Sequence, residues 1–155
     1  MLQDNELSDF FAAITETASP SGFEKEVQKI FTDFARPCAD EIYSDVNGNA
    51  IALKKGKGLL KLMVTAHIDE IGFMVKYIDD QGYLWFRPIG GFDSALLPGL
   101  GVRVQHGRDI HFGIVGRKPI HLLEESERKT VNGDDLWIDI GAKDKADAMA
   151  RIAIG

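Results

Sequence analysis

The feature that most constrains the fold is an apolar run, residues 59–64 (LLKLMV), which leads directly into a histidine and two carboxylates. The run has the length and composition of a buried central strand. His67, Asp69 and Glu70 follow it within a few residues. Because such polar groups are costly to bury without partners, we expect a strand with a polar site at its end.

The spacing of His67 and Asp69 places both side chains on one side of an extended backbone. A metal-bound imidazole needs this arrangement, with one ring nitrogen on the metal and an acceptor that fixes the ring. A structural hydrogen bond between the two side chains explains the spacing equally well. The residues alone leave both interpretations open.

The first third of the chain has an α/β pattern. Apolar residues at helical spacing predict one helix that ends before residues 19–22 and a second that stops near Pro37. Ser21 and Glu24 have the spacing of a capping box for the second helix. Asn47 and Gly48 predict a hairpin between strands at residues 41–45 and 49–54, and residues 55–58 an exposed turn.

After Gly72 the pattern changes to short strands separated by turn residues, which predicts a small closed or nearly closed β-structure. We expect a short helix at residues 144–150 and the start of a strand at 151–155. Residues 122–129 are rich in charge and predict a solvated helix or a mobile loop. The expected strands are residues 73–78, 83–88, 102–105, 110–116 and 136–140.

Composition excludes several classes of protein. A net charge of −6 with a pI near 5.2 argues against nucleic acid or an anionic membrane as partner. No apolar stretch reaches the roughly 18 residues that cross a bilayer, and the acidic residues 1–6 do not resemble a signal peptide. Cys38 is the only cysteine, so no internal disulfide can form, and we expect a cytoplasmic protein.

Three further histidines are candidate site residues. His106 and His111 flank a predicted hairpin turn and are expected at the surface. His121 follows a rigid Lys-Pro-Ile segment, so it is either aimed at a site or a partner subunit, or it is an ordinary loop histidine.

Four motifs, in this order, resemble the glutamyl and deblocking aminopeptidases, a family that includes the tetrahedral aminopeptidases and some members labelled endoglucanase or cellulase. The resemblance runs from about residue 5 to residue 155 and covers only the N-terminal part of the family's chain. The motifs are residues 20–24 (PSGFE), 45–52 (DVNGNAIA), 66–75 (AHIDEIGFMV) and 116–121 (GRKPIH).

The resemblance implies an aminopeptidase, which hydrolyses peptides and removes their N-terminal residues. The reaction would use two divalent metal ions, zinc or cobalt. It makes His67 a metal ligand and Asp69 the catalytic-site residue that orients it, and it gives Glu70 no clear role. The other ligands and the general base would lie beyond residue 155. We therefore expect at most one weak metal site and no activity from these residues alone.

The implied architecture is α/β. Residues 1–72 would form the N-terminal portion of a di-metal exopeptidase domain, and residues 73–155 an inserted, β-barrel-like dimerisation domain, incomplete at its C-terminal end. The resemblance also implies that the protein forms homodimers, and that full-length members of the family can form a dodecamer.

Two alternatives to the peptidase remain. One is a non-catalytic assembly module built around residues 73–155. The other, ranked last, is an endoglucanase-type glycoside hydrolase, which would need two carboxylates across a cleft, with Trp85 and Trp137 as sugar platforms.

Overall fold

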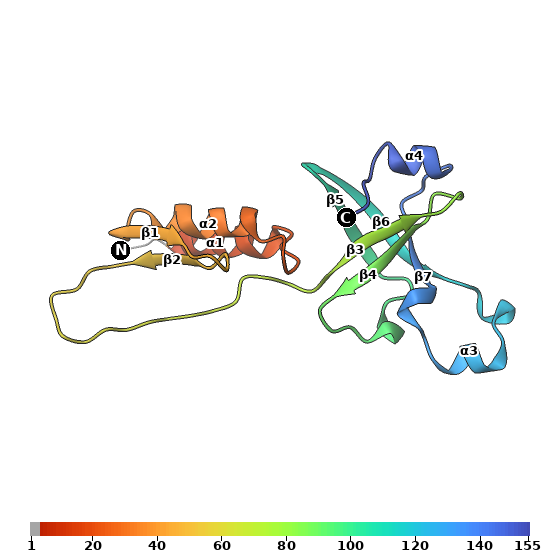
Figure 1. Cartoon of the computed structure of the whole chain (residues 1–155), viewed down its shortest axis with the longest axis horizontal. Coiled ribbons are helices and arrows are strands. Elements are labelled where there is room, and N and C mark those ends of the chain that lie inside the picture. Colours follow the sequence, from red (N-terminus) through yellow and green to blue (C-terminus); the bar gives the residue numbers. More distant parts are fainter. Residues whose placement is uncertain (1–3) are drawn as a thin grey trace. The chain divides into compact units, whose positions relative to one another are not determined.

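A computed structural model describes residues 4–155; residues 1–3, part of the acidic N-terminal stretch, lie outside the described residues. The chain divides into two compact units, Met1–Glu70 and Ile71–Gly155 (Figure 1). The division by itself assigns no role to either unit. No helix in the described part of the chain is long and apolar enough to cross a membrane.

The first unit contains two helices, as the apolar spacing predicted. They are α1 (Asp4–Glu16) and α2 (Lys25–Ala35). The rings of Phe10 and Phe34 stack with their centroids 3.9 Å apart, and Val27 is fully buried. The apolar faces of the two helices therefore pack against each other.

The predicted capping box at the start of α2 is wrong. Glu24 itself occupies the N-cap position and its side chain caps no helical amide. Its carboxylate instead accepts a hydrogen bond from the amide of Gly22, 2.6 Å away. The hydroxyl of Ser21, which a capping box would use, is engaged outside the helix.

The predicted hairpin is confirmed, with strands β1 (Glu41–Ser44) and β2 (Ala50–Leu53) paired antiparallel. Gly48 has a φ of 85°, a conformation that glycine adopts without strain. The Asp45 carboxylate accepts hydrogen bonds from the backbone amides of Asn47 and Asn49, each 2.9 Å away. The turn is therefore held by its own polar side chains.

The buried central strand expected at residues 59–64 is not formed. The segment has no strand partner, and its five apolar side chains are 85–103% exposed. A strand buried on both faces needs neighbouring strands and covering helices. Among the described residues of the first unit, the only sheet is the β1–β2 hairpin, so nothing is available to cover the run.

The second unit is a five-stranded antiparallel sheet that curls on itself (Figure 1). The order β3-β4-β7-β6-β5 leaves β3 and β5 as unpaired edges, so the curled sheet is open and not closed into a barrel. All five strands were predicted within one or two residues. They are β3 (Gly72–Ile78), β4 (Leu84–Ile89), β5 (Gly101–His106), β6 (Asp109–Arg117) and β7 (Leu136–Asp139).

Short helical segments fill the connections of this sheet. The charged stretch at 122–129 contains a short helix, one of the two forms expected for it. The segments are η1 (Ser94–Leu96), η2 (Ile120–Leu122), α3 (Glu125–Lys129), η3 (Gly133–Asp135) and α4 (Lys145–Met149).

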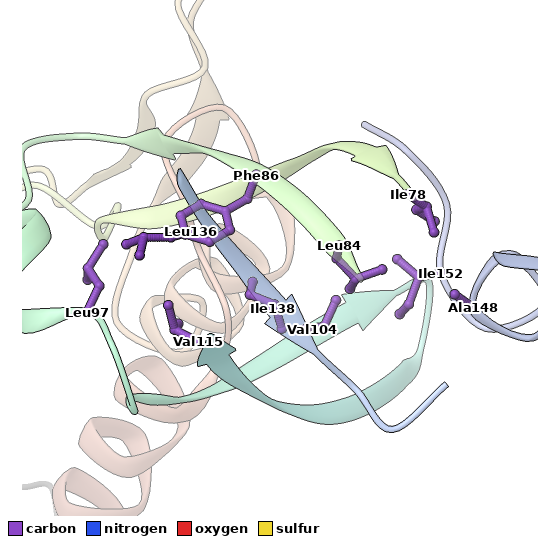
Figure 2. Close-up of a cluster of buried hydrophobic side chains, with 10 residues drawn as sticks. All are labelled: Ile78, Leu84, Phe86, Leu97, Val104, Val115, Leu136, Ile138, Ala148 and Ile152. Atoms are coloured by element: carbon purple, nitrogen blue, oxygen red, sulfur yellow. The ribbon is translucent and has the colours of Figure 1, made fainter. Parts of the chain in front are cut away.

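One hydrophobic core supports the second unit, and Figure 2 shows its side chains gathered among the strands of the curled sheet, with Ala148 and Ile152 added by the C-terminal segment. The strand predicted at 151–155 is not formed. Instead, Ile152 is buried in this core, and the Gly155 amide donates a 3.1 Å hydrogen bond to the carbonyl of Val75. The core residues are Ile78, Leu84, Phe86, Leu97, Val104, Val115, Leu136, Ile138, Ala148 and Ile152.

Candidate functional site

The candidate site lies in the first unit, where residues 67–70 meet the turn between α1 and α2. The Glu70 amide donates to the Ser19 carbonyl at 2.9 Å, and the Ser19 amide donates to the Glu70 carboxylate at 3.0 Å. Pro20 and Glu70 form an isolated parallel bridge. This reciprocal pairing fixes the chain on the C-terminal side of His67.

His67 and Asp69 are brought together, as their spacing predicted. The His67 Nδ1 atom lies 2.9 Å from the Asp69 backbone carbonyl and 3.2 Å from its carboxylate Oδ1. Both of these oxygens can only accept, so Nδ1 carries the proton. In the neutral ring this leaves the lone pair on Nε2, the form of imidazole that binds a metal.

Ser21 completes a chain of three side chains. Its hydroxyl donates to Asp69 Oδ2 at 2.5 Å, so the two carboxylate oxygens of Asp69 are held by different partners. The Ser21 hydrogen bond, and after it the His67 contact, hold the pKa of Asp69 below its ordinary value of 3.8. Asp69 therefore stays ionised, as an acceptor that orients an imidazole must.

Glu70, whose role the sequence left unclear, contacts the backbone and not the histidine. Its carboxylate accepts from the amide of Ser19, a residue that is only 3% exposed. Because a buried amide without a partner is costly, this contact stabilises the turn that carries Ser21. We assign Glu70 a structural contribution to the site.

The fit of a metal ion to these residues is limited by the number of ligands. His67 is 85% exposed and has a fixed ring orientation, as a ligand requires. In the described part of the chain, however, no group of three or more histidine, cysteine, aspartate or glutamate side chains is placed to hold an ion. Protein zinc sites use three or four such ligands, so no catalytic step through a metal is derived from these residues.

The other histidines do not join this cluster. His121 is exposed in η2 of the second unit. His106 is at the surface as expected, with Nδ1 3.1 Å from the Arg151 carbonyl. His111 departs from the expectation: it is half-buried because it pairs with Val104, whose side chain belongs to the core.

The pair of carboxylates needed for glycoside hydrolysis is also absent from this cluster. Asp69 is engaged by Ser21 and Glu70 by Ser19, so neither is poised as a proton donor. Trp85 and Trp137 are half-buried and pack on each other with centroids 5.8 Å apart. These observations give no support to a sugar-cleaving site.

Ser21 is the site residue that the sequence did not reveal. It lies 48 residues from Asp69, and the capping-box spacing with Glu24 offered a local explanation for it. The only available signal was that Ser21 falls within the motif at residues 20–24.

The architecture is that of the N-terminal part of an α/β peptidase, and comparison with known proteins agrees on this fold. The family model for M42 glutamyl aminopeptidase matches residues 48–155. The chain belongs to this family.

A putative aminopeptidase of Acetivibrio thermocellus is 36% identical over 155 residues, which is 99% of this chain and 44% of that protein. Among solved structures, the TET aminopeptidase of the marine sediment archaeon Thaumarchaeota archaeon SCGC AB-539-E09 superposes with a TM-score of 0.89 at 35% identity, covering 99% of this chain and 43% of that one.

Two further structures extend the comparison. A Thermotoga maritima protein described as an endoglucanase has a TM-score of 0.75 at 32% identity, covering 94% of this chain and 42% of its own. The Pyrococcus horikoshii TET1 peptidase, which can assemble into a tetrahedron or a large octahedral shell, has a TM-score of 0.79 at 33% identity, covering 97% and 44%. The chain thus spans less than half the length of these relatives.

Proposed function

We propose that this chain supplies the N-terminal part of a metal-dependent aminopeptidase that removes N-terminal residues from peptides. His67 is the metal ligand and Asp69 the residue that orients it. The observation that carries the proposal is the hydrogen-bonded chain Ser21–Asp69–His67, which fixes the ring and leaves Nε2 for a metal. The aminopeptidase names of its relatives support the same activity.

A bound pair of divalent ions, zinc or cobalt, would polarise the substrate carbonyl and activate water. The 155 residues offer one ligand toward such a site, so affinity for a single ion should be weak. Calorimetric titration of the chain with zinc should reveal no tight stoichiometric site. A tight 1:1 site that disappears in His67→Ala would contradict this, and His121→Ala would then be the next variant to titrate.

Because the 155 residues offer only one metal ligand, we also expect them to lack peptidase activity on their own. The 155 residues alone should release no chromogenic amine from aminoacyl substrates in the presence of zinc, cobalt or manganese. Turnover that is lost in His67→Ala and retained in His106→Ala would show that these residues suffice for catalysis.

We place the protein in the cytoplasm, which suits an exposed, unpaired Cys38.

A second candidate function, homotypic assembly through the second unit, is favoured by a row of exposed apolar side chains on β6. Ile110, Phe112 and Ile114 alternate with inward-facing residues and are 51–77% exposed. A row of this kind on a curled sheet with open edges suits a symmetric partner. The shells formed by the Pyrococcus horikoshii TET1 peptidase support the proposal of dimers and, for a longer chain, dodecamers.

Sedimentation of the chain at micromolar concentration tests this second function. We expect a dimer that Phe112→Ser converts to a monomer. Leu96→Ser, at an equally exposed apolar position in η1, should leave the dimer intact. A well-folded monomer before any substitution would remove the assembly function.

A further inference from the structure

The tripeptide Val-Asn-Gly occurs twice in this chain, at residues 46–48 and 131–133. The first copy lies in the turn between β1 and β2, and the second leads into η3. Both asparagines, Asn47 and Asn132, are exposed. An asparagine that precedes glycine can deamidate spontaneously, because glycine has no side chain to shield its backbone nitrogen. The two copies share this chemistry, so the surroundings of each copy decide which one reacts.

Deamidation begins at the backbone nitrogen that follows the asparagine. This nitrogen loses its proton and attacks the carbon of the side-chain amide. A C–N bond forms, and the side-chain nitrogen leaves as ammonia. Water then opens the resulting cyclic imide at either carbonyl and gives aspartate or isoaspartate. The reaction needs no oxidant or reductant, but it does need a backbone N–H that is free to lose its proton.

The N–H of Gly48, in the first copy, is already engaged. It donates to the carbonyl of Asp45 at 3.1 Å, and the Gly48 carbonyl accepts from Gln28 Nε2 at 2.6 Å. Hydrogen bonds from Asn49 hold the pKa of the Asp45 carboxylate below its ordinary value of 3.8. A negative charge therefore lies beside the Gly48 amide at neutral pH and opposes the loss of its proton.

The N–H of Gly133, in the second copy, has no hydrogen-bond partner among the residues that the structure describes. The side-chain oxygen of Asn132 accepts from the Asp134 amide at 3.2 Å, which polarises the carbonyl that the nitrogen attacks. The Asp134 carboxylate is paired with Lys76 Nζ at 2.6 Å, so a cation offsets its charge. The second copy thus combines a free nucleophile with a polarised amide.

We propose that Asn132 is a site of spontaneous deamidation and that the hairpin turn protects Asn47 from the same reaction. Leu136, which is fully buried and begins β7, lies four residues after Asn132. Aspartate at position 132 would keep an acceptor for the Asp134 amide. Isoaspartate would lengthen the main chain by a methylene and shift η3 against the packed Leu136. The isoaspartate form of the second unit should therefore be less stable.

The test incubates the chain at mildly alkaline pH, where amide protons are lost more readily, and follows both asparagines by peptide mass spectrometry. We expect residue 132 to convert roughly three- to tenfold faster than residue 47, the factor that one net hydrogen bond of ordinary strength makes. In urea-unfolded chain the two rates should converge, because the tripeptides are identical. Asp45→Ala should speed conversion at residue 47 alone, whereas Asp9→Ala, at an exposed position of α1, should change neither rate.

Several outcomes overturn the proposal. Equal rates in the folded chain, or faster conversion of Asn47, would show that the free Gly133 N–H does not select the site. A preference for Asn132 that persists in urea would assign the difference to sequence neighbours and not to the fold.

The structural consequence is measured on the same incubated material, after the isoaspartate form has been separated. That form should unfold at a lower urea concentration than the fresh chain, whereas Asn132→Asp should unfold close to the fresh chain. An isoaspartate form as stable as the fresh chain would remove the expected effect on η3.

Discussion

The Ser21 hydroxyl donates a hydrogen bond to the Asp69 carboxylate across 48 residues of sequence, and this contact orders the candidate site. One oxygen of Asp69 is occupied by Ser21 and the other faces His67. The turn between the two helices therefore sets the orientation of the imidazole through a single carboxylate. A metal ligand gains basicity and a fixed tautomer from an acceptor held in this way.

Replacing Ser21 should change the ionisation of Asp69. The Ser21 hydrogen bond is the largest cause of the lowered pKa of Asp69, so Ser21→Ala should raise that pKa toward 3.8. Because the folded-state pKa is depressed, the stabilisation it brings is complete above pH values near 3.8 and is lost as pH falls through the folded value. Carboxyl carbon shifts in an NMR titration measure the change.

Ser44→Ala provides the matched control for that titration, because Ser44 is an exposed serine in β1. An Asp69 pKa that does not move in Ser21→Ala would show that Ser21 is not its main partner.

Removing the Glu70 carboxylate should loosen the turn that carries Ser21. Glu70→Ala takes away the acceptor for the Ser19 amide, whereas Glu70→Gln keeps an oxygen in place. For a net hydrogen bond of about 0.5–1.5 kcal/mol, exchange of the Ser19 amide should become roughly three- to tenfold faster in Glu70→Ala. Equal exchange rates in the two variants would show that the backbone pairing alone holds the turn.

The elements that sequence reasoning located are those marked by local periodicity and by turn residues at their ends. Both helices, the β1–β2 hairpin and all five strands of the second sheet follow from local periodicity and turn residues. The contact between His67 and Asp69 also follows, because a spacing of two residues in extended chain suffices.

Sequence reasoning failed where the outcome depends on distant partners. Residues 59–64 have the composition of a buried strand, yet burial requires neighbours that the described part of this unit lacks. The segment 151–155 has strand-like composition but contributes Ile152 to a core built mainly from the sheet. The spacing of Ser21 and Glu24 predicts a local cap, because nothing in the sequence marks a hydrogen bond over 48 residues.

A methyl group at Gly116 should destabilise the second unit. A Cβ built at this position would lie 2.3 Å from Nε1 of Trp137, its cross-strand neighbour. Gly116→Ala should therefore lower the free energy of unfolding by about 1–3 kcal/mol, as overpacking does. Urea unfolding followed by tryptophan fluorescence reports this unit alone, since both tryptophans, Trp85 and Trp137, belong to it.

Gly91→Ala is the control, because a Cβ there meets no atom within 4 Å. Its unfolding free energy should stay within about 0.5 kcal/mol of the parent chain. Equal losses at the two glycines would attribute the effect to backbone freedom and not to the contact with Trp137.

Truncation of Phe86 should be the more damaging of two phenylalanine substitutions in the second unit. Phe86 is 1% exposed and packs against Phe73 with ring centroids 4.4 Å apart, whereas Phe112 is 77% exposed. Phe86→Ala should cost about 3–5 kcal/mol, the sum of lost burial and a cavity. Phe112→Ala, measured at protein concentrations too low for association, should cost less than about 0.5 kcal/mol. Comparable losses would mean that Phe112 is buried in solution, and concentration-dependent unfolding would then identify a partner copy as the cover.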